Sequence, residues 1–128
     1  MKLLKQIIEK KIDSYNNYLI KKHYPRAFWQ FYQALSICLA ISKIYDLSYN
    51  LTKKEINTRN IIYNDIISNR KMTEEDFKLI TRFISNDFKI IFSTLEYIEK
   101  LNESSEANVS DIERDQFIGV LACEVENL

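Results

Sequence analysis

The sequence predicts an all-α protein, a single-domain up-and-down bundle of about five helices over residues 1–128. Turn-forming residues are scarce: the chain holds one glycine and one proline, whereas the hairpins and bulges of β-sheets use both. Apolar residues recur in steps of three and four, which is the period of a helix. The 128 residues, 46% of them hydrophobic, suffice for one core without disulfides.

Two helices are predicted in the first third of the chain. The first covers residues 2–22, and its apolar face consists of Leu4, Ile8, Ile12, Tyr15 and Leu19. The second begins near Pro25, which fits a first helical turn because no hydrogen bond is lost there, and runs to about Asp46. It is apolar around most of its circumference, which predicts a central, buried helix.

Three further helices begin at capping sequences. Thr52 and Glu55 match a capping box, and the helix that follows ends at about Asn69. Thr73, followed by three acids, opens a long helix with an apolar seam made of Phe77, Ile80, Ile84, Phe88, Ile91, Leu95 and Ile98. After a polar loop over residues 102–108, Ser110 and Glu113 match another capping box, which predicts a fifth helix.

The segment over residues 23–33 concentrates aromatic side chains and includes the one tryptophan of the chain. On a helical wheel most of its rings face the core, but Trp29 falls in a polar stripe with Arg26 and Gln33. One interpretation is that Trp29 is covered by a neighbouring helix, with its indole N–H bonded to a carbonyl. The other makes Trp29 a partly exposed anchor beside Arg26, close enough for a cation–π contact.

Catalytic chemistry finds little support in the sequence. His23 is the sole imidazole, and Cys38 and Cys123 lie in apolar runs that predict buried thiols. No Cys/His cluster has metal-binding spacing. We therefore expect a non-enzymatic protein with no catalytic residues, no cofactor and no metal.

One enzyme hypothesis remains, in which a divalent cation is held by carboxylates on one helical face, namely Glu96, Glu99 and Glu103. A membrane location is not expected, because the most apolar segment, residues 27–45, contains several polar side chains and one lysine. The N-terminal residues show no signal-peptide pattern, so the expected location is the cytoplasm.

The net charge of zero conceals a division of charge along the chain. Residues 1–60 carry eleven Lys and Arg against four acids, and residues 61–128 carry seven against fourteen. Three interpretations are open. The two halves neutralise one another within the fold; the basic half binds a nucleic-acid backbone; or the acidic half binds a basic protein.

We favour the third interpretation, a protein-binding inhibitor. Its most concrete form is an immunity protein or antitoxin that neutralises a basic toxin, such as a nuclease, through an acidic C-terminal surface. The predicted partner-binding residues are Glu96, Glu99, Glu103, Glu106, Asp111, Glu113, Asp115, Trp29 and Arg26. The alternative is a small DNA- or RNA-binding regulator that uses the basic N-terminal half, with Lys2, Lys5, Lys10, Lys11, Lys21, Lys22 and Arg26.

Overall fold

The computed structural model describes residues 2–69 and 73–103, and this part of the chain forms four α-helices and no strand. The helices are α1 (Lys2–Ile20), α2 (Tyr24–Ile44), α3 (Lys53–Asn69) and α4 (Glu74–Glu103). The all-α bundle predicted from the sequence is confirmed. The expected fifth helix, with its capping residues Ser110 and Glu113, lies outside the described residues.

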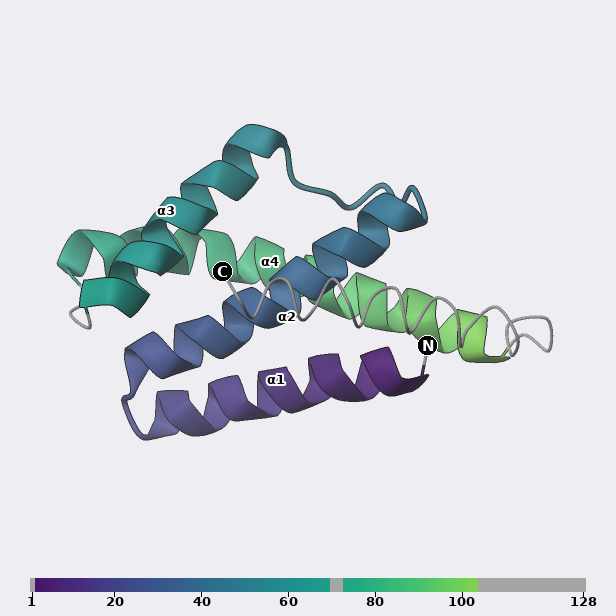
Figure 1. Ribbon diagram of the computed structural model, residues 1–128, viewed down its shortest axis with the longest axis horizontal. Coiled ribbons are helices and arrows are strands. Elements are labelled where there is room, and N and C mark those ends of the chain that lie inside the picture. Colours follow the sequence, from purple (N-terminus) through teal and green to yellow (C-terminus); the bar gives the residue numbers. More distant parts are fainter. Residues whose placement is uncertain (1, 70–72, 104–128) are drawn as a thin grey trace.

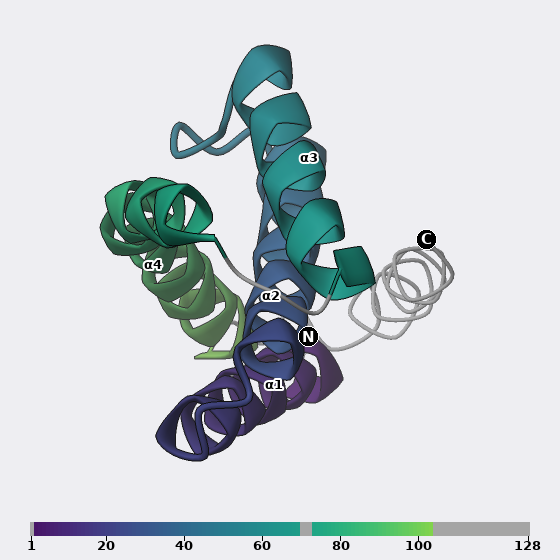
Figure 2. The same cartoon turned by 90° about the vertical axis from the view of Figure 1, so that its left-hand side faces the viewer.

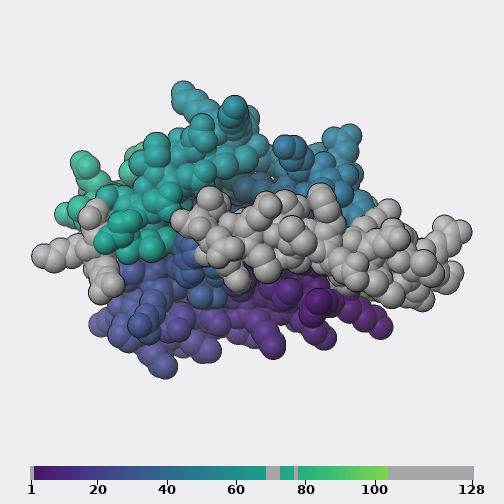
Figure 3. Space-filling view, in the orientation of Figure 1, coloured from purple at the N-terminus to yellow at the C-terminus, as the bar shows by residue number. Residues whose placement is uncertain are grey.

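Successive helices reverse direction, and α2 lies in the middle of the bundle (Figure 1). Seen from the end, α1, α3 and α4 surround α2 (Figure 2), and α2 contacts all three. The most extensive contact joins α1 to α2. In the view of Figure 3, α1 lies along the lower edge, α3 lies at the upper left, and the residues around the end of α2 lie at the upper right. The central, buried helix predicted from the apolar circumference of residues 25–46 is therefore α2.

Two helices end in left-handed turns without using glycine. After α1, Lys22 has a φ of 60°, its N–H donates to the Leu19 carbonyl (3.0 Å), and the His23 N–H donates to the Tyr18 carbonyl (2.9 Å). Asp46 takes the same conformation after α2, with a φ of 53°. These are Schellman motifs, which usually place glycine in the left-handed position. They explain why α1 and α2 stop at Ile20 and Ile44, two residues earlier than the sequence predicts.

The capping residues predicted for α3 and α4 make the expected hydrogen bonds. The Glu55 N–H donates to Thr52 Oγ1 (3.2 Å), and the Thr52 N–H donates to Glu55 Oε1 (3.0 Å). At the start of α4, the Asp76 N–H donates to Thr73 Oγ1 (3.1 Å). Each threonine accepts a hydrogen bond from an amide that has no partner within its helix.

Aromatic rings form the centre of the core. The Phe31 ring lies 5.2 Å from Tyr15 of α1 and 4.9 Å from Phe88 of α4, measured between ring centroids. Tyr63 of α3 lies 4.9 Å from Tyr32 and 6.3 Å from Phe28. Most of the aromatic segment over residues 23–33 therefore belongs to the core, because its rings join α2 to each of the other three helices.

The buried face of α4 differs from the predicted seam. Ile80, Ile91 and Ile98 are buried as expected, whereas Ile84, Phe88 and Leu95 are only half-buried, and the side chain of Phe77 lies outside the described part. Two polar residues, Asp87 and Thr94, are fully buried in place of the half-buried seam residues. Asp87 is buried because it makes a polar contact with α3 that the apolar pattern does not reveal, and Thr94 Oγ1 donates to the Ile90 carbonyl within α4 at 2.8 Å. Among the helices of the described residues, none has the length and apolar character needed to cross a bilayer.

Candidate functional site

The outer face of α4 carries an exposed aromatic residue at the head of an acidic row. Phe92, Glu96, Glu99 and Glu103 follow one another in steps of four, three and four, so they lie along one side of the helix. All four are exposed, and Phe92 is 57% exposed. Its ring stacks on Phe88 at 5.5 Å, and Phe88 in turn contacts Phe31 of the core. We call Phe92, Glu96, Glu99 and Glu103 the α4 stripe.

Two carboxylates of the α4 stripe have cationic neighbours. Lys100 Nζ lies 3.7 Å from Glu96 Oε1, one turn along the same helix. Lys5 Nζ of α1 lies 3.8 Å from Glu99 Oε1 and 3.8 Å from Glu9 Oε1. The Lys5–Glu99 contact is a local case of the internal neutralisation considered above. The carboxylates of Glu9, Glu96 and Glu99 are each more than half exposed, so such ion pairs contribute little to stability and leave these carboxylates available to a partner.

The remaining acidic residues predicted to bind a partner, Glu106, Asp111, Glu113 and Asp115, lie outside the described residues. Within the described ranges, no three His, Cys, Asp or Glu side chains are grouped so that they could hold a metal ion. Glu96, Glu99 and Glu103 are spread along the helix and do not converge on one point, so the cation hypothesis has no geometric support.

The cations of the N-terminal half do not form a single track. Lys5 is engaged with the acids of α1 and α4, and Lys11 Nζ donates to the buried Gln33 Oε1 at 2.7 Å. Gln33 was assigned to a polar stripe of α2, and the structure shows that this part of the stripe packs against α1. Lys21, Lys22 and Arg26 are exposed together where α1 turns into α2.

Trp29 is half-buried, so it lies between the two interpretations of the sequence, one with the indole covered by a neighbouring helix and the other with the indole partly exposed beside Arg26. It lines a pocket at the α1–α2 corner, opposite Ile67 of α3. The cation–π contact expected between Arg26 and Trp29 is not the one observed, because Arg26 Cζ lies over the Tyr18 ring, 6.0 Å from its centroid. Tyr18 lies in the last turn of α1, two residues before its end, and only residues 21–23 connect α1 to the helix that carries Arg26.

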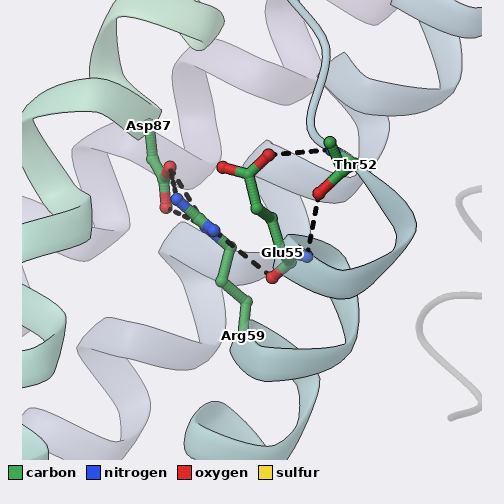
Figure 4. A network of polar contacts seen from close by, with 4 residues as sticks. All are labelled: Thr52, Glu55, Arg59 and Asp87. Atoms are coloured by element: carbon green, nitrogen blue, oxygen red, sulfur yellow. Dashed lines mark hydrogen bonds and ion pairs between the residues drawn. The ribbon is translucent and has the colours of Figure 1, made fainter.

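A buried ion pair joins α3 to α4 (Figure 4). Arg59 Nε donates to both carboxylate oxygens of Asp87, at 3.1 and 2.9 Å, and Nη2 donates to Oδ1 at 2.7 Å. Nη1 donates to the Glu55 carbonyl at 3.3 Å, and the guanidinium lies 4.3 Å from the Phe83 ring centroid. Burial raises the pKa of Asp87, and Arg59 opposes that rise.

The sequence analysis missed this pair, although a signal existed. Asp87 follows Ile80 by seven residues and precedes Ile91 by four, which is the spacing of a buried position. Arg59 lies three residues after Ile56 and four before Tyr63, on the inner face of α3. Because the carboxylate and the guanidinium satisfy one another, this pair has the character of a structural clamp and not of a reactive site.

The thiol of Cys38 and the imidazole of His23, which nucleophilic catalysis would need side by side, lie apart in the structure. Cys38 is fully buried in the middle of α2, whereas His23 is exposed before the first turn of that helix. Burial raises the pKa of the Cys38 thiol to about 12, and a hydrogen bond with Thr94 opposes the rise. Such a thiol is protonated at neutral pH, and the one imidazole of the chain, His23, lies fifteen residues away along the chain and not beside it. Cys123 lies outside the described residues.

Comparisons of the chain with protein-family models, with curated proteins and with solved structures find no match.

Proposed function

We propose that the chain is a non-enzymatic protein that binds and neutralises a basic protein, and that the α4 stripe is its binding surface. The most concrete form of this proposal is an immunity protein or antitoxin directed against a basic toxin such as a nuclease. The observation that supports it is the position of Phe92, a 57% exposed aromatic ring directly in line with three exposed carboxylates.

The two parts of the stripe suit different steps of association. Carboxylates in a row attract a positively charged partner and raise the association rate, an effect that salt suppresses. An exposed aromatic ring supplies the apolar contact that slows dissociation once the partner has docked. Phe92 is held in place by its stack on Phe88, so a partner would meet a ring that is already oriented.

The alternative, a nucleic-acid-binding regulator, has less support from the geometry. Of the seven cations on which it depends, Lys5 is in contact with carboxylates and Lys11 with Gln33. The other five are exposed where described, but they are divided between the start of α1, its middle and the α1–α2 corner. A phosphate backbone is bound by cations that follow one continuous path.

The test compares two pairs of variants with matched controls. Phe92→Ala removes the exposed ring, and Ile61→Ala is its control, because Ile61 is 71% exposed and belongs to α3, not to the helix that carries the stripe. Glu96→Lys with Glu103→Lys reverses two charges of the stripe, and Asp13→Lys with Glu75→Lys makes the same charge change at exposed positions elsewhere. Glu99 is left intact because it contacts Lys5.

Each tagged full-length chain is used to capture proteins from the organism that encodes it, and the association rate with any purified basic partner is measured. We expect one basic protein to be captured by the wild type and both controls and lost with the charge reversal. Phe92→Ala should weaken the complex by about 2 kcal/mol or more, as for an interface hot spot. Association should slow as the Debye length falls from about 10 Å at 0.1 M salt to about 3 Å at 1 M.

Equal binding by the stripe variants and their controls would refute the proposal. Binding of nucleic acid that is lost with Lys21→Glu and Arg26→Glu, but not with the stripe variants, would establish the alternative. Melting curves must accompany each variant, and all are expected to lie close to the wild type because every substituted side chain is exposed.

A further inference from the structure

A pocket of about 540 Å³ lies at the corner where α1 ends and α2 begins, facing the last turns of α3. In Figure 1 this corner is at the left-hand end of the molecule, where the α1–α2 connection and the end of α3 come together. Its volume is within the range of sites for small organic molecules, about 300–1,000 Å³. The described residues that line it are Lys22, His23, Pro25, Arg26, Trp29 and Ile67.

Among the described residues of this lining, the permanent charges are all positive. Lys22 and Arg26 supply two permanent cations, and none of the described lining residues is acidic. The cations that form ion pairs within residues 2–69 and 73–103 are Lys5, Arg59, Lys78 and Lys100. Lys22 and Arg26 are not among them. An anion entering the pocket would therefore meet two charged donors without displacing a carboxylate from either.

The backbone of Lys22 and the guanidinium of Arg26 are both held by contacts at the α1–α2 corner. The Lys22 backbone is fixed in the left-handed conformation by the two hydrogen bonds that close α1. Arg26 lies over the Tyr18 ring, and the His23 ring meets the same tyrosine edge-on at 6.5 Å. Because the Arg26 guanidinium already has a contact that orients it, it loses less conformational entropy when a ligand binds than a side chain without such a contact would.

The other wall of the pocket is aromatic and apolar. Trp29 is half-buried and lines the pocket together with the apolar side chains of Pro25 and Ile67. An indole in such a place offers a flat surface to a planar ring, and base–indole stacking is tolerant of which base is present. The pocket thus combines donors for an anion with a platform for a ring.

We propose that this corner pocket binds a small phosphorylated molecule with a planar ring, of the nucleoside monophosphate class. The phosphate lies against Lys22 and Arg26, and the ring lies against Trp29. A phosphate fits these donors better than a carboxylate does, because it offers three oxygens and nearly two charges to a guanidinium fork and an ammonium together. The site is separate from the α4 stripe and does not depend on the proposed protein partner.

The chain contains a single tryptophan, so its fluorescence reports on this pocket alone. The full-length protein is titrated with AMP, with adenosine and with inorganic phosphate while Trp29 emission is followed. We expect AMP to change the emission saturably, and adenosine and phosphate alone to bind about tenfold more weakly or worse. Stripe variants such as Glu96→Lys with Glu103→Lys should bind AMP as the wild type does.

Arg26→Gln and Lys22→Gln should each weaken AMP binding about tenfold or more, which is the effect of losing one charge-assisted hydrogen bond. Lys43→Gln is the control, because Lys43 is an exposed cation at the far end of α2, and it should leave the affinity unchanged. Arg26→Lys should recover part of the loss, since it restores the charge without the planar fork. Melting curves show whether each variant is folded.

Absence of saturable binding up to the millimolar range would overturn the proposal. If adenosine bound as tightly as AMP, the proposed role of Lys22 and Arg26 in binding the phosphate would be refuted. If inorganic phosphate bound as tightly as AMP, the proposed role of Trp29 in binding the ring would be refuted. AMP binding that is insensitive to both Arg26→Gln and Lys22→Gln would place the ligand elsewhere on the protein, and would likewise overturn the proposal.

Discussion

Replacing Arg59 by methionine should destabilise the protein by about 3–5 kcal/mol at pH 7, the cost of leaving one partner of a buried ion pair alone. Arg59 is 3% exposed and Asp87 is 0% exposed, so water cannot replace the three contacts that the guanidinium makes with the carboxylate. Methionine keeps a long apolar side chain in place of arginine but removes the guanidinium, whose Cζ lies 4.3 Å from the Phe83 ring centroid, so the loss reports on the buried charge together with this cation–π contact. A domain is stable by about 5–15 kcal/mol, so the loss is large.

The same variant should respond to pH in a definite direction. In the wild type, burial raises the pKa of Asp87 while Arg59 opposes the rise. Without Arg59 the folded-state pKa rises further, so the folded variant binds a proton at pH values where the unfolded chain does not. Its stability should therefore increase as the pH falls from 7 through that folded-state pKa, and the difference from the wild type should shrink.

Urea unfolding followed by circular dichroism, at pH 7 and at several lower values, measures both effects. The double variant Arg59→Met with Asp87→Leu carries neither charge, so it should recover most of the stability at pH 7 and lose this contribution to the pH dependence. A loss below about 1 kcal/mol for Arg59→Met at pH 7, comparable to a single neutral hydrogen bond, would refute the reasoning. So would a loss that does not change with pH.

Three other substitutions follow from the described contacts. Lys22→Gly should raise the free energy of unfolding by about 1 kcal/mol, because glycine adopts the left-handed conformation at the end of α1 without steric cost; an unchanged melting temperature would contradict this. Tyr63→Phe should not destabilise the protein, and a loss above about 1 kcal/mol would mean that its buried hydroxyl, which has no hydrogen-bond partner among the described residues, is paired after all. In a Cys123→Ser background, Cys38 should react with a thiol reagent only as fast as the protein opens, since it is fully buried with a pKa raised to about 12; rapid reaction in the folded protein would disprove that burial.

The starts of α3 and α4 were predictable because their signals are local. Thr52 with Glu55, and Thr73 with Asp76, act within one turn of chain, and the structure shows their hydrogen bonds. The ends of α1 and α2 were predicted two residues too late. Lys22 and Asp46 occupy positions where glycine usually announces a left-handed turn, so no residue type marked the stop.

The contacts between helices were less accessible from sequence. An aspartate within an apolar repeat can be buried in an ion pair or exposed at the edge of the apolar face. For Asp87 the outcome depends on the contact with Arg59, which belongs to another helix and is not indicated by the local sequence. Because Asp87 and Thr94 occupy the middle of the buried face, the half-buried seam residues Ile84, Phe88 and Leu95 lie toward its edge. Phe92, beyond that edge, becomes an exposed ring. The acidic residues of the stripe could therefore be identified from the sequence, whereas the exposure of Phe92 next to them could not.

The short connection between α1 and α2 affects the order in which the helices can pair while the chain is being synthesised. These two helices share the most extensive contact of the bundle and are joined by residues 21–23 alone, so their pairing requires little loop closure. As the chain is synthesised from its N-terminus, the α1–α2 hairpin is complete well before α4 exists. Phe31 cannot contact Phe88 until α4 has been synthesised. Between the synthesis of α2 and that of α4, the nascent α1–α2 hairpin exposes the aromatic surface that later becomes the core.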